Sequence, residues 1–355
     1  MGIHTQSRAT HAPPHGSARR HRPHEALRDD DAVNRTPVAG NTRRGRGLSP
    51  AALLSEHLDR PGLPSSLTAP VRLLAPCGWR SRAGTSKVAT VDSGFDSTDI
   101  PIPAQVLVLA LGRPVRVVWH NGVGGVTCEY GEGEGRRFVK WSPTGSVDLA
   151  AEAARLDWAV QFVRVPVVVD AGSDGDGSWM MTLPVAGENA VTKRWVGDPA
   201  SATRAIGEGL RALHDTLPVA LCPFSWSAAE RVADAQQRAE TGEIDPAEWD
   251  EAHRPLDLRA ALALVRDIPD VDKFVVCHGD TCAPNTLIDD SGNWSGHVDF
   301  GSMGVADRWA DLAIATLSTT WNYGPGWEQS VLDAYGIEAD PGRTRYYRVL
   351  WDLDP

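Results

Sequence analysis

Three side chains suited to phosphoryl-transfer chemistry lie within one short stretch, VVCHGDTCAPNTLIDDSGNWSGHVDFG, which covers residues 275–301. Asp280 is followed five residues later by an amide, Asn285, and Asp299 comes nineteen residues after Asp280. A carboxylate at a loop tip can aim an acceptor hydroxyl and receive its proton. Carboxylate and amide oxygens are also the hard ligands that Mg²⁺ prefers. Phosphoryl transfer from a nucleotide needs these parts together, because it depends on positioning and charge compensation.

The spacing matches the catalytic loop of protein kinases, in which an Asp is followed by an Asn five residues later and then by the Asp of a D-F-G turn. Asp299-Phe300-Gly301 spells that turn, and His278-Gly279 stands where kinases have His-Arg. We interpret His278 as a structural residue that holds the loop by a hydrogen bond. Short apolar runs predict three strands in this region, near Phe274–Cys277, Thr286–Ile288 and Gly296–Val298.

A lysine and a glutamate upstream supply two further parts of such a site. Lys140 stands in RFVKW, on a strand predicted over Arg137–Trp141, where its ammonium would reach the α- and β-phosphates of a nucleotide. Glu152 lies on the next predicted helix and is placed to pair with Lys140. The alternative is a surface ion pair without a role in the site, and such pairs contribute little to the stability of the fold.

A glycine-rich turn, Asn121–Gly125, falls between strands predicted at Val115–Trp119 and Val126–Tyr130. Backbone amides in such a turn can cover phosphates. The residues that would do so here are Asn121, Gly122 and Gly124.

Hydrophobic periodicity predicts two regions. Residues 100–183 read as five strands with one helix after the third, a β-rich nucleotide-binding lobe. Residues 184–355 read as a mostly helical catalytic and substrate-binding lobe. Its helices are predicted at residues 202–217, Ser227–Ala239, Leu256–Asp267, Asp307–Ser318, Gly326–Tyr335 and Gly342–Leu353. An antiparallel β lobe followed by a helical lobe is a two-lobed α+β fold.

The first 99 residues differ from the rest. Residues 1–47 are rich in Pro, His, Arg and Gly and hold few bulky apolar residues. Such a segment buries too little surface to offset the entropy of ordering. The chain stays rich in Ser, Gly and Arg up to about Asp99. We expect residues 1–99 to be a disordered or non-native extension that takes no part in the site.

Charge and composition indicate which classes of partner to expect. The first hundred residues hold 14 Lys and Arg against 9 Asp and Glu, whereas residues 101–355 hold 21 against 37. An acidic folded region disfavours nucleic acid and favours a cationic ligand, although solubility alone also explains the charge. No run of about eighteen apolar residues occurs, so that we expect no membrane span.

The five cysteines are odd in number and scattered, which suits reduced thiols in a cytoplasm. Four residues near Asp280 are of the types that bind zinc: Cys277, His278, Cys282 and His297. Their spacing lacks the C-x-x-C or H-x-x-x-H pairs usual for such sites.

Beyond the kinase loop, residues 275–315 (VVCHGD through ADLAIA) resemble the signature of the aminoglycoside phosphotransferases, especially the 3′-phosphotransferase branch. LRALHDTLPVALCPFSWS, residues 210–227, and RYYRVLWDL, residues 345–353, are similar to the same branch. The resemblance covers about residues 100–355. It implies a protein-kinase-like fold, ATP or GTP as donor, Mg²⁺ as cofactor and a hydroxyl of a cationic aminoglycoside antibiotic as acceptor.

Carried over by position, the resemblance implies a role for each matching residue. Asp280 would be the catalytic base, with Asn285 and Asp299 as metal ligands. Lys140 and Glu152 would orient the phosphates. The hinge that meets adenine would lie at Met181, Thr182 and Leu183. Family members bind the antibiotic through acidic residues, and the matching positions are Asp250, Glu251 and Asp352.

The chain departs from the family after the D-F-G turn. Many relatives read D-x-G-R there, whereas Ser302 follows Gly301 in this chain. A cation near the phosphates or the substrate is therefore missing, unless Arg308 or another residue replaces it.

The sequence thus predicts a cytoplasmic, ATP-dependent phosphotransferase that modifies an aminoglycoside hydroxyl (3′-type), confers resistance and is a monomer or weak dimer. Two alternatives stay open. One is a kinase of the same fold acting on an amino sugar or other metabolite. The other, motivated by the missing arginine, is a nucleotide-binding protein that is regulatory and not catalytic.

Overall fold

The first lobe is built on a five-stranded antiparallel sheet with strand order β1-β2-β3-β5-β4. A computed structural model describes residues 100–147 and 149–354, so that the predictions made for residues 1–99 lie outside the described residues. The strands are β1 Val115–His120, β2 Val126–Tyr130, β3 Arg137–Pro143, β4 Val168–Ser173 and β5 Gly177–Thr182. The five predicted strands and the helix after the third are confirmed.

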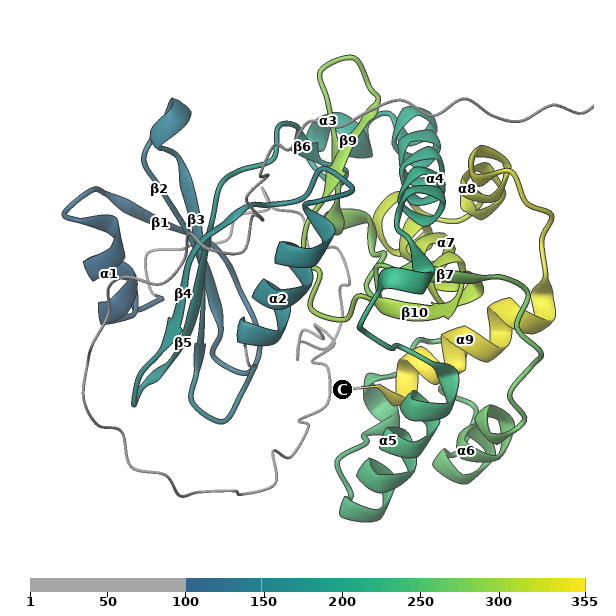
Figure 1. Cartoon of the computed structure of the whole chain (residues 1–355). Helices are drawn as coiled ribbons and strands as arrows, with labels where there is room; N and C mark the ends of the chain where they lie inside the picture. Colours follow the sequence, from purple (N-terminus) through teal and green to yellow (C-terminus); the bar gives the residue numbers. More distant parts are fainter. Residues whose placement is uncertain (1–99, 148, 355) are drawn as a thin grey trace, which may run out of the picture. The chain divides into compact units, whose positions relative to one another are not determined.

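Two helices flank this sheet on opposite faces (Figure 1). Because side chains alternate along a strand, neighbouring residues of β3 face different helices. Val139 is fully buried in the apolar cluster beneath α1 (Ala104–Ala110). Lys140, on the opposite face, reaches α2 (Leu149–Ala159). The alternation therefore places the lysine on the face that also meets the second lobe.

Helix α1 was not anticipated from the sequence. Its residues AQVLVLA include two β-branched valines, which weaken a helix prediction. The helix forms because Val106 and Ala110 are buried against the sheet, and it ends at Leu111 with a φ of 52°. Tertiary packing thus overrides the local preference.

The second lobe is mainly helical, as predicted. Its helices are α3 Lys193–Val196, α4 Pro199–Thr216, α5 Ala228–Thr241, α6 Leu258–Arg266, α7 Trp309–Tyr323, α8 Glu328–Tyr335 and α9 Pro341–Leu353. Among the described residues, none of the helices is both long enough and apolar enough to cross a bilayer.

Short strands interrupt these helices and carry the loops of the site. They are β6 Glu188–Asn189, β7 Phe274–Cys277, β8 Thr286–Ile288, β9 Trp294–His297 and β10 Gly304–Asp307. β7 pairs with β10, and β8 pairs with β6 and β9. The strand predicted near Gly296–Val298 lies earlier, and β10 was missed because its sequence GVAD lacks the apolar run that marks β7.

Helix α2 belongs to the core of the second lobe as well as to the sheet. Its buried residues Leu149, Ala153 and Leu156 are part of the same apolar cluster as α4, α7 and α9. The helix that follows the lysine strand is therefore held by apolar contacts with both lobes.

Helices α4 and α8 pack closely at a glycine. A Cβ added at Gly207 would lie 2.4 Å from the carbonyl oxygen of Val331 and 2.7 Å from the Cβ of Ala334. We expect Gly207→Ala to lower the free energy of unfolding by about 1–3 kcal/mol, because overpacking of this size outweighs the gain of about 1 kcal/mol in helix propensity. Urea denaturation measures the difference.

The matched control is Glu208→Ala, one residue further on the exposed side of α4. It should change the free energy of unfolding by less than about 0.5 kcal/mol. A Gly207→Ala variant as stable as the parent would contradict the close approach of the two helices.

Candidate functional site

A buried carboxylate on α7 holds the loop that follows β7. Asp311 Oδ2 accepts a hydrogen bond from the His278 N–H at 2.6 Å, and Oδ1 accepts one from the Gly279 N–H at 3.0 Å. The Thr281 hydroxyl donates to the Asp311 carbonyl oxygen at 2.7 Å. The backbone on both sides of Asp280 is therefore fixed to one helix.

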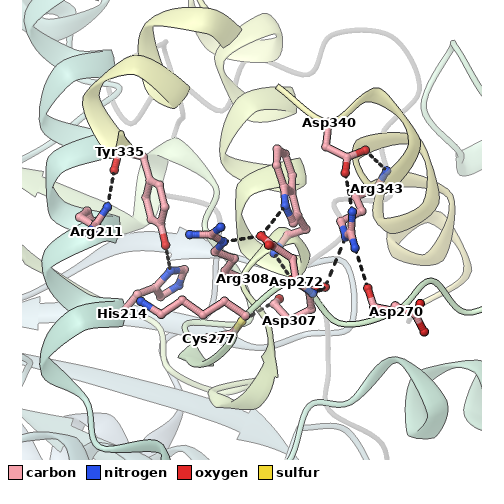
Figure 2. Close-up of polar contacts among 12 residues, drawn as sticks. Arg211, His214, Asp270, Asp272, Cys277, Asp307, Arg308, Tyr335, Asp340 and Arg343 are labelled. Carbon is pink, nitrogen blue, oxygen red and sulfur yellow. Dashed lines mark hydrogen bonds and ion pairs between the residues drawn. The ribbon is translucent and has the colours of Figure 1, made fainter. Parts of the chain in front are cut away.

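The Asp311 carboxylate is itself braced by α4 and α8. His214 Nε2 lies 2.9 Å from Asp311 Oδ2. On its other side, His214 Nδ1 lies 2.9 Å from the hydroxyl oxygen of Tyr335, the contact drawn in Figure 2. Burial alone would raise the pKa of Asp311, but the hydrogen bond and charge of His214, with the backbone donors, lower it below its ordinary value. Asp311 thus stays ionised as an acceptor.

His214 and Asp311 were not predicted to support the loop. The available signal was a histidine on the otherwise apolar face of the α4 pattern, and an Asp in the first turn of α7. Neither pattern says that the two side chains meet, since they are 97 residues apart.

Gly279 explains why His-Gly-Asp replaces His-Arg-Asp here. Its φ is +89°, and a Cβ would lie 2.3 Å from the carbonyl oxygen of Ser302. No side chain fits between the loop and the segment after Asp299. The two parts of the site therefore touch through their backbones.

The predicted structural role of His278 is confirmed. Its Nδ1 accepts a hydrogen bond from the Asp280 N–H at 3.1 Å, and its Nε2 lies 3.0 Å from the Val298 carbonyl oxygen. One imidazole thereby links the backbone of the loop with that of the strand end before Asp299. With both nitrogens engaged, His278 is not available as one of the four zinc ligands considered above.

The structure brings Asp280, Asn285 and Asp299 together. Asn285 Nδ2 donates to the Asp280 carbonyl oxygen at 3.0 Å, so that the oxygen of this amide is the atom that could act as a ligand. Burial, and next the negative charge of Asp299, raise the pKa of Asp280 above its ordinary value. The second effect requires the two carboxylates to be near neighbours.

The predicted pair of Lys140 and Glu152 forms, and it includes Asp299. Lys140 Nζ lies 2.7 and 3.0 Å from the two Glu152 oxygens and 3.1 Å from Asp299 Oδ1. The Lys140 side chain is 17% exposed and that of Glu152 5%, so the alternative of a surface ion pair is wrong. Burial alone would lower the pKa of Lys140, but Asp299 and Glu152 outweigh it and raise the pKa.

The charge of this cluster fits a divalent cation. Glu152 and Asp299 share the Lys140 ammonium, and Asp280 adds a third carboxylate close enough to Asp299 to feel its charge. Burial and the charge of Asp299 raise the pKa of Glu152, and the opposing effect of Lys140 does not cancel this rise. Because the like charges disfavour each other's ionisation, a cation with oxygen ligands would relieve them. The donor set of carboxylate and amide oxygens suits Mg²⁺.

The turn Asn121–Gly125 is closed on itself. Asn121 Oδ1 accepts from the N–H groups of Val123 and Gly125, at 3.2 and 2.6 Å. The Asn121 N–H donates to the Gly125 carbonyl oxygen at 2.9 Å, and the Gly124 N–H to the Asn121 carbonyl oxygen at 3.3 Å. Three backbone amides were expected to cover phosphates. Those of Asn121 and Gly124 are hydrogen-bonded within the turn. Gly122 carries the third.

The residues predicted to meet adenine lie at the end of β5. Met181 Sδ accepts a hydrogen bond from the Tyr130 hydroxyl at 2.8 Å. Thr182 is buried, and the Leu183 N–H donates to the Val167 carbonyl oxygen at 2.9 Å. These residues close the sheet where the chain passes to the second lobe.

Two of the three acidic residues expected at the substrate come together. Asp352 Oδ1 accepts from the Asp250 N–H at 3.1 Å, and Asp352 Oδ2 lies 2.5 Å from His253 Nδ1. The Trp321 indole donates to Asp250 Oδ2 at 2.9 Å. Asp250 is 9% and Asp352 6% exposed, whereas the neighbouring Glu251 faces solvent.

Arg308 does not supply the cation expected after the D-F-G turn. Its Nε donates to Asp272 Oδ2 at 2.6 Å (Figure 2). Burial raises the pKa of Tyr335 to about 12, and the nearby Arg308 guanidinium partly opposes this rise. Arg308 therefore links the segment before β7 with Tyr335 of α8. Ser302 is buried below Gly279 and contributes no charge.

Comparison with known proteins agrees with this geometry. The Phosphotransferase enzyme family matches residues 121–347. An aminoglycoside 3′-phosphotransferase of Streptomyces fradiae is 34% identical over 212 residues, which are 57% of this chain and 78% of that protein.

Two solved structures are similar over most of their length. The aminoglycoside-3′-phosphotransferase of type VIII has a TM-score of 0.61 at 29% identity, covering 70% of this chain and 98% of the other. APH(3″)-Id from Streptomyces rimosus, solved in complex with ADP and streptomycin, has a TM-score of 0.57 at 27% identity and covers 70% and 97%. These neighbours confirm the predicted two-lobed, kinase-like fold. With a family match over well more than half of its residues, the chain belongs to the APH phosphotransferase enzyme family.

Proposed function

We propose that the protein is an ATP-dependent phosphotransferase that transfers the γ-phosphate to a 3′-type hydroxyl of an aminoglycoside and so confers resistance. The observation that carries this proposal is the meeting of Asp280 and Asp299 with the buried Lys140–Glu152 pair. The relatives named as aminoglycoside phosphotransferases, and the neighbour bound to ADP and streptomycin, support the donor and acceptor classes.

Each residue of the cluster has a distinct part in this chemistry. Asp280, held by its backbone on both sides, accepts the proton of the acceptor hydroxyl as the oxygen becomes a nucleophile. Lys140, kept charged and in place by Glu152, offers its ammonium to the phosphates. Asn285 and Asp299 would hold Mg²⁺, which neutralises the charge of the phosphates when bound.

The acidic second lobe suits a cationic acceptor. Asp250 and Asp352 form a preorganised pair, and Glu251 adds an exposed carboxylate beside it. A polyamine sugar would be attracted by this charge before it makes contact. The product carries about two additional negative charges at neutral pH, which weaken its binding to anionic RNA. The need for ATP leads us to place the reaction in the cytoplasm.

Replacement of Asp280 tests the base. Asp280→Asn should lower kcat with kanamycin by about 10²–10⁴-fold, because the proton acceptor is lost. The affinity for ADP should change little, since the amide has the shape of the carboxylate. Coupled turnover assays and calorimetry on the full chain measure the two effects.

Asp290→Asn is the control, because the Asp290 side chain is 98% exposed and lies on a turn of the same region. It should leave kcat unchanged. A wild-type chain that turns over an amino sugar but no aminoglycoside would identify a metabolite kinase. A chain that binds ADP and phosphorylates no hydroxyl substrate would be regulatory.

Replacement of Lys140 tests the phosphate contact. Lys140→Met should raise KM for ATP by about tenfold or more, the effect of losing one charge-assisted contact. KM for the aminoglycoside should stay near its original value. Lys273→Met is matched to it, because Lys273 pairs with Asp215 on the exposed surface. Equal effects of the two substitutions would refute the assignment of Lys140.

Replacement of Glu251 tests the substrate contact. Glu251→Gln should raise KM for the aminoglycoside severalfold with little change in kcat, since an exposed charge contributes attraction to the encounter. The effect should shrink in 0.5 M salt, where screening shortens to roughly 4 Å. Glu240→Gln, an exposed glutamate of α5, provides the comparison. If both variants behave like the parent, Glu251 does not meet the substrate.

A further inference from the structure

Helix α2 places two side chains, three residues apart, against the backbone of residues 299–303. Residues with this spacing lie on the same face of a helix. Arg155 Nε donates to the Met303 carbonyl oxygen at 2.9 Å. Glu152, beside its contact with Lys140, lies close enough to the Phe300 N–H for that donor to act on the pKa of the carboxylate. One helix face thus meets the D-F-G turn at Phe300 and the segment after it at Met303.

The turn needs such support because its backbone is strained. Asp299 has a φ of 69°, in the left-handed region that residues other than glycine rarely adopt. Conformations of this kind persist only where the surroundings enforce them. Within the turn, the Met303 N–H donates to the Phe300 carbonyl oxygen at 3.1 Å. The contacts of Glu152 and Arg155 are the links from this turn to α2.

Movement of this segment would also disturb the base. Gly279 lies so close to Ser302 that a Cβ on it would be 2.3 Å from the Ser302 carbonyl oxygen. Arg155 and Gly279 therefore contact consecutive residues of the segment from two sides. A shift of Met303 would be transmitted to the loop that carries Asp280.

The Arg155 guanidinium is itself fixed. Its Nη1 donates to the Ala151 carbonyl oxygen at 3.0 Å, and its Cζ lies 5.0 Å from the centroid of the Phe224 ring. Stacking on an aromatic ring and a backbone contact leave Nε directed at one acceptor. The geometry is that of a preorganised donor.

Building on the proposed function, we infer that Arg155 is a positioning residue that, together with Glu152, keeps Asp299 in its metal-binding conformation. It supplies from α2 a cationic contact to the segment after the D-F-G turn, in which Ser302 brings no charge. Arg155 acts on the backbone of the segment and does not touch the phosphates.

Hydrogen exchange of the full chain, without nucleotide or Mg²⁺, tests the contact directly. Arg155→Met keeps an apolar stem but removes the donors. It should speed exchange of the Phe300 and Met303 amides by about tenfold or more, the factor for losing one hydrogen bond from a charged group. Arg155→Lys, which keeps the charge but lacks Nε, should do the same and replaces Arg155→Met if that variant does not fold.

Asp157→Asn is the control. Asp157 is an exposed residue of the same helix, two positions after Arg155, and residues with this spacing do not share a helix face. Its replacement should leave exchange of the two amides at the wild-type rate. Wild-type exchange in the Arg155 variants, or equal acceleration in Asp157→Asn, would overturn the inference, because α2 would then act only as a general contact between the lobes.

The dependence of activity on Mg²⁺ provides a second test of the role of Arg155. Arg155→Met should raise the Mg²⁺ concentration for half-maximal turnover severalfold and leave KM for the aminoglycoside unchanged. An unchanged Mg²⁺ requirement would overturn the link to Asp299 even if exchange is faster. A wild-type chain without phosphotransferase activity would refute the proposed function, whereas the exchange result would still decide whether Arg155 holds the turn.

Discussion

The site depends on one electrostatic constraint: two carboxylates meet one ammonium in a largely buried cluster, and a third carboxylate lies beside them. Glu152 and Asp299 both contact Lys140, and the pKa of Asp280 is raised by burial and by Asp299. Such an arrangement is costly for a protein without a ligand, because like charges are held together away from water. A cation and a polyphosphate would offset this cost. Under the proposed function, the cluster is a preorganised binding site, and local costs of this kind are common at functional sites.

The remainder of the fold holds these charges where they are. The alternation of β3 directs Lys140 to the inner face of the sheet, and α2 belongs to the cores of both lobes. On the other side, Asp311 and His214 fix the loop that carries Asp280 through buried hydrogen bonds. Buried, fully paired networks of this kind specify one conformation. Rigid elements thus position the reactive groups, which lie on short loops between them.

Much of this arrangement could be predicted from the sequence, because it rests on local patterns. Period-two alternation located the five strands, and helical spacing located α4 and its successors. The intervals between Asp280, Asn285 and Asp299 indicated one cleft, and Lys140 with Glu152 indicated an ion pair. Tertiary contacts were beyond reach: α1 forms by packing on the sheet, and His214 meets Asp311 across 97 residues. For the same reason Arg308 was considered as the missing cation, although Asp272, far from it in the chain, binds it.

If the cluster binds a metal–nucleotide complex for phosphoryl transfer, a crystal structure of the full chain with Mg²⁺ and a non-hydrolysable ATP analogue will show it. We expect Mg²⁺ at about 2.0–2.1 Å from oxygens of Asn285 and Asp299, with the Lys140 ammonium on the phosphates and the Asp280 carboxylate free to meet the acceptor. A nucleotide bound elsewhere, or a metal held without either ligand, would refute this role of the cluster.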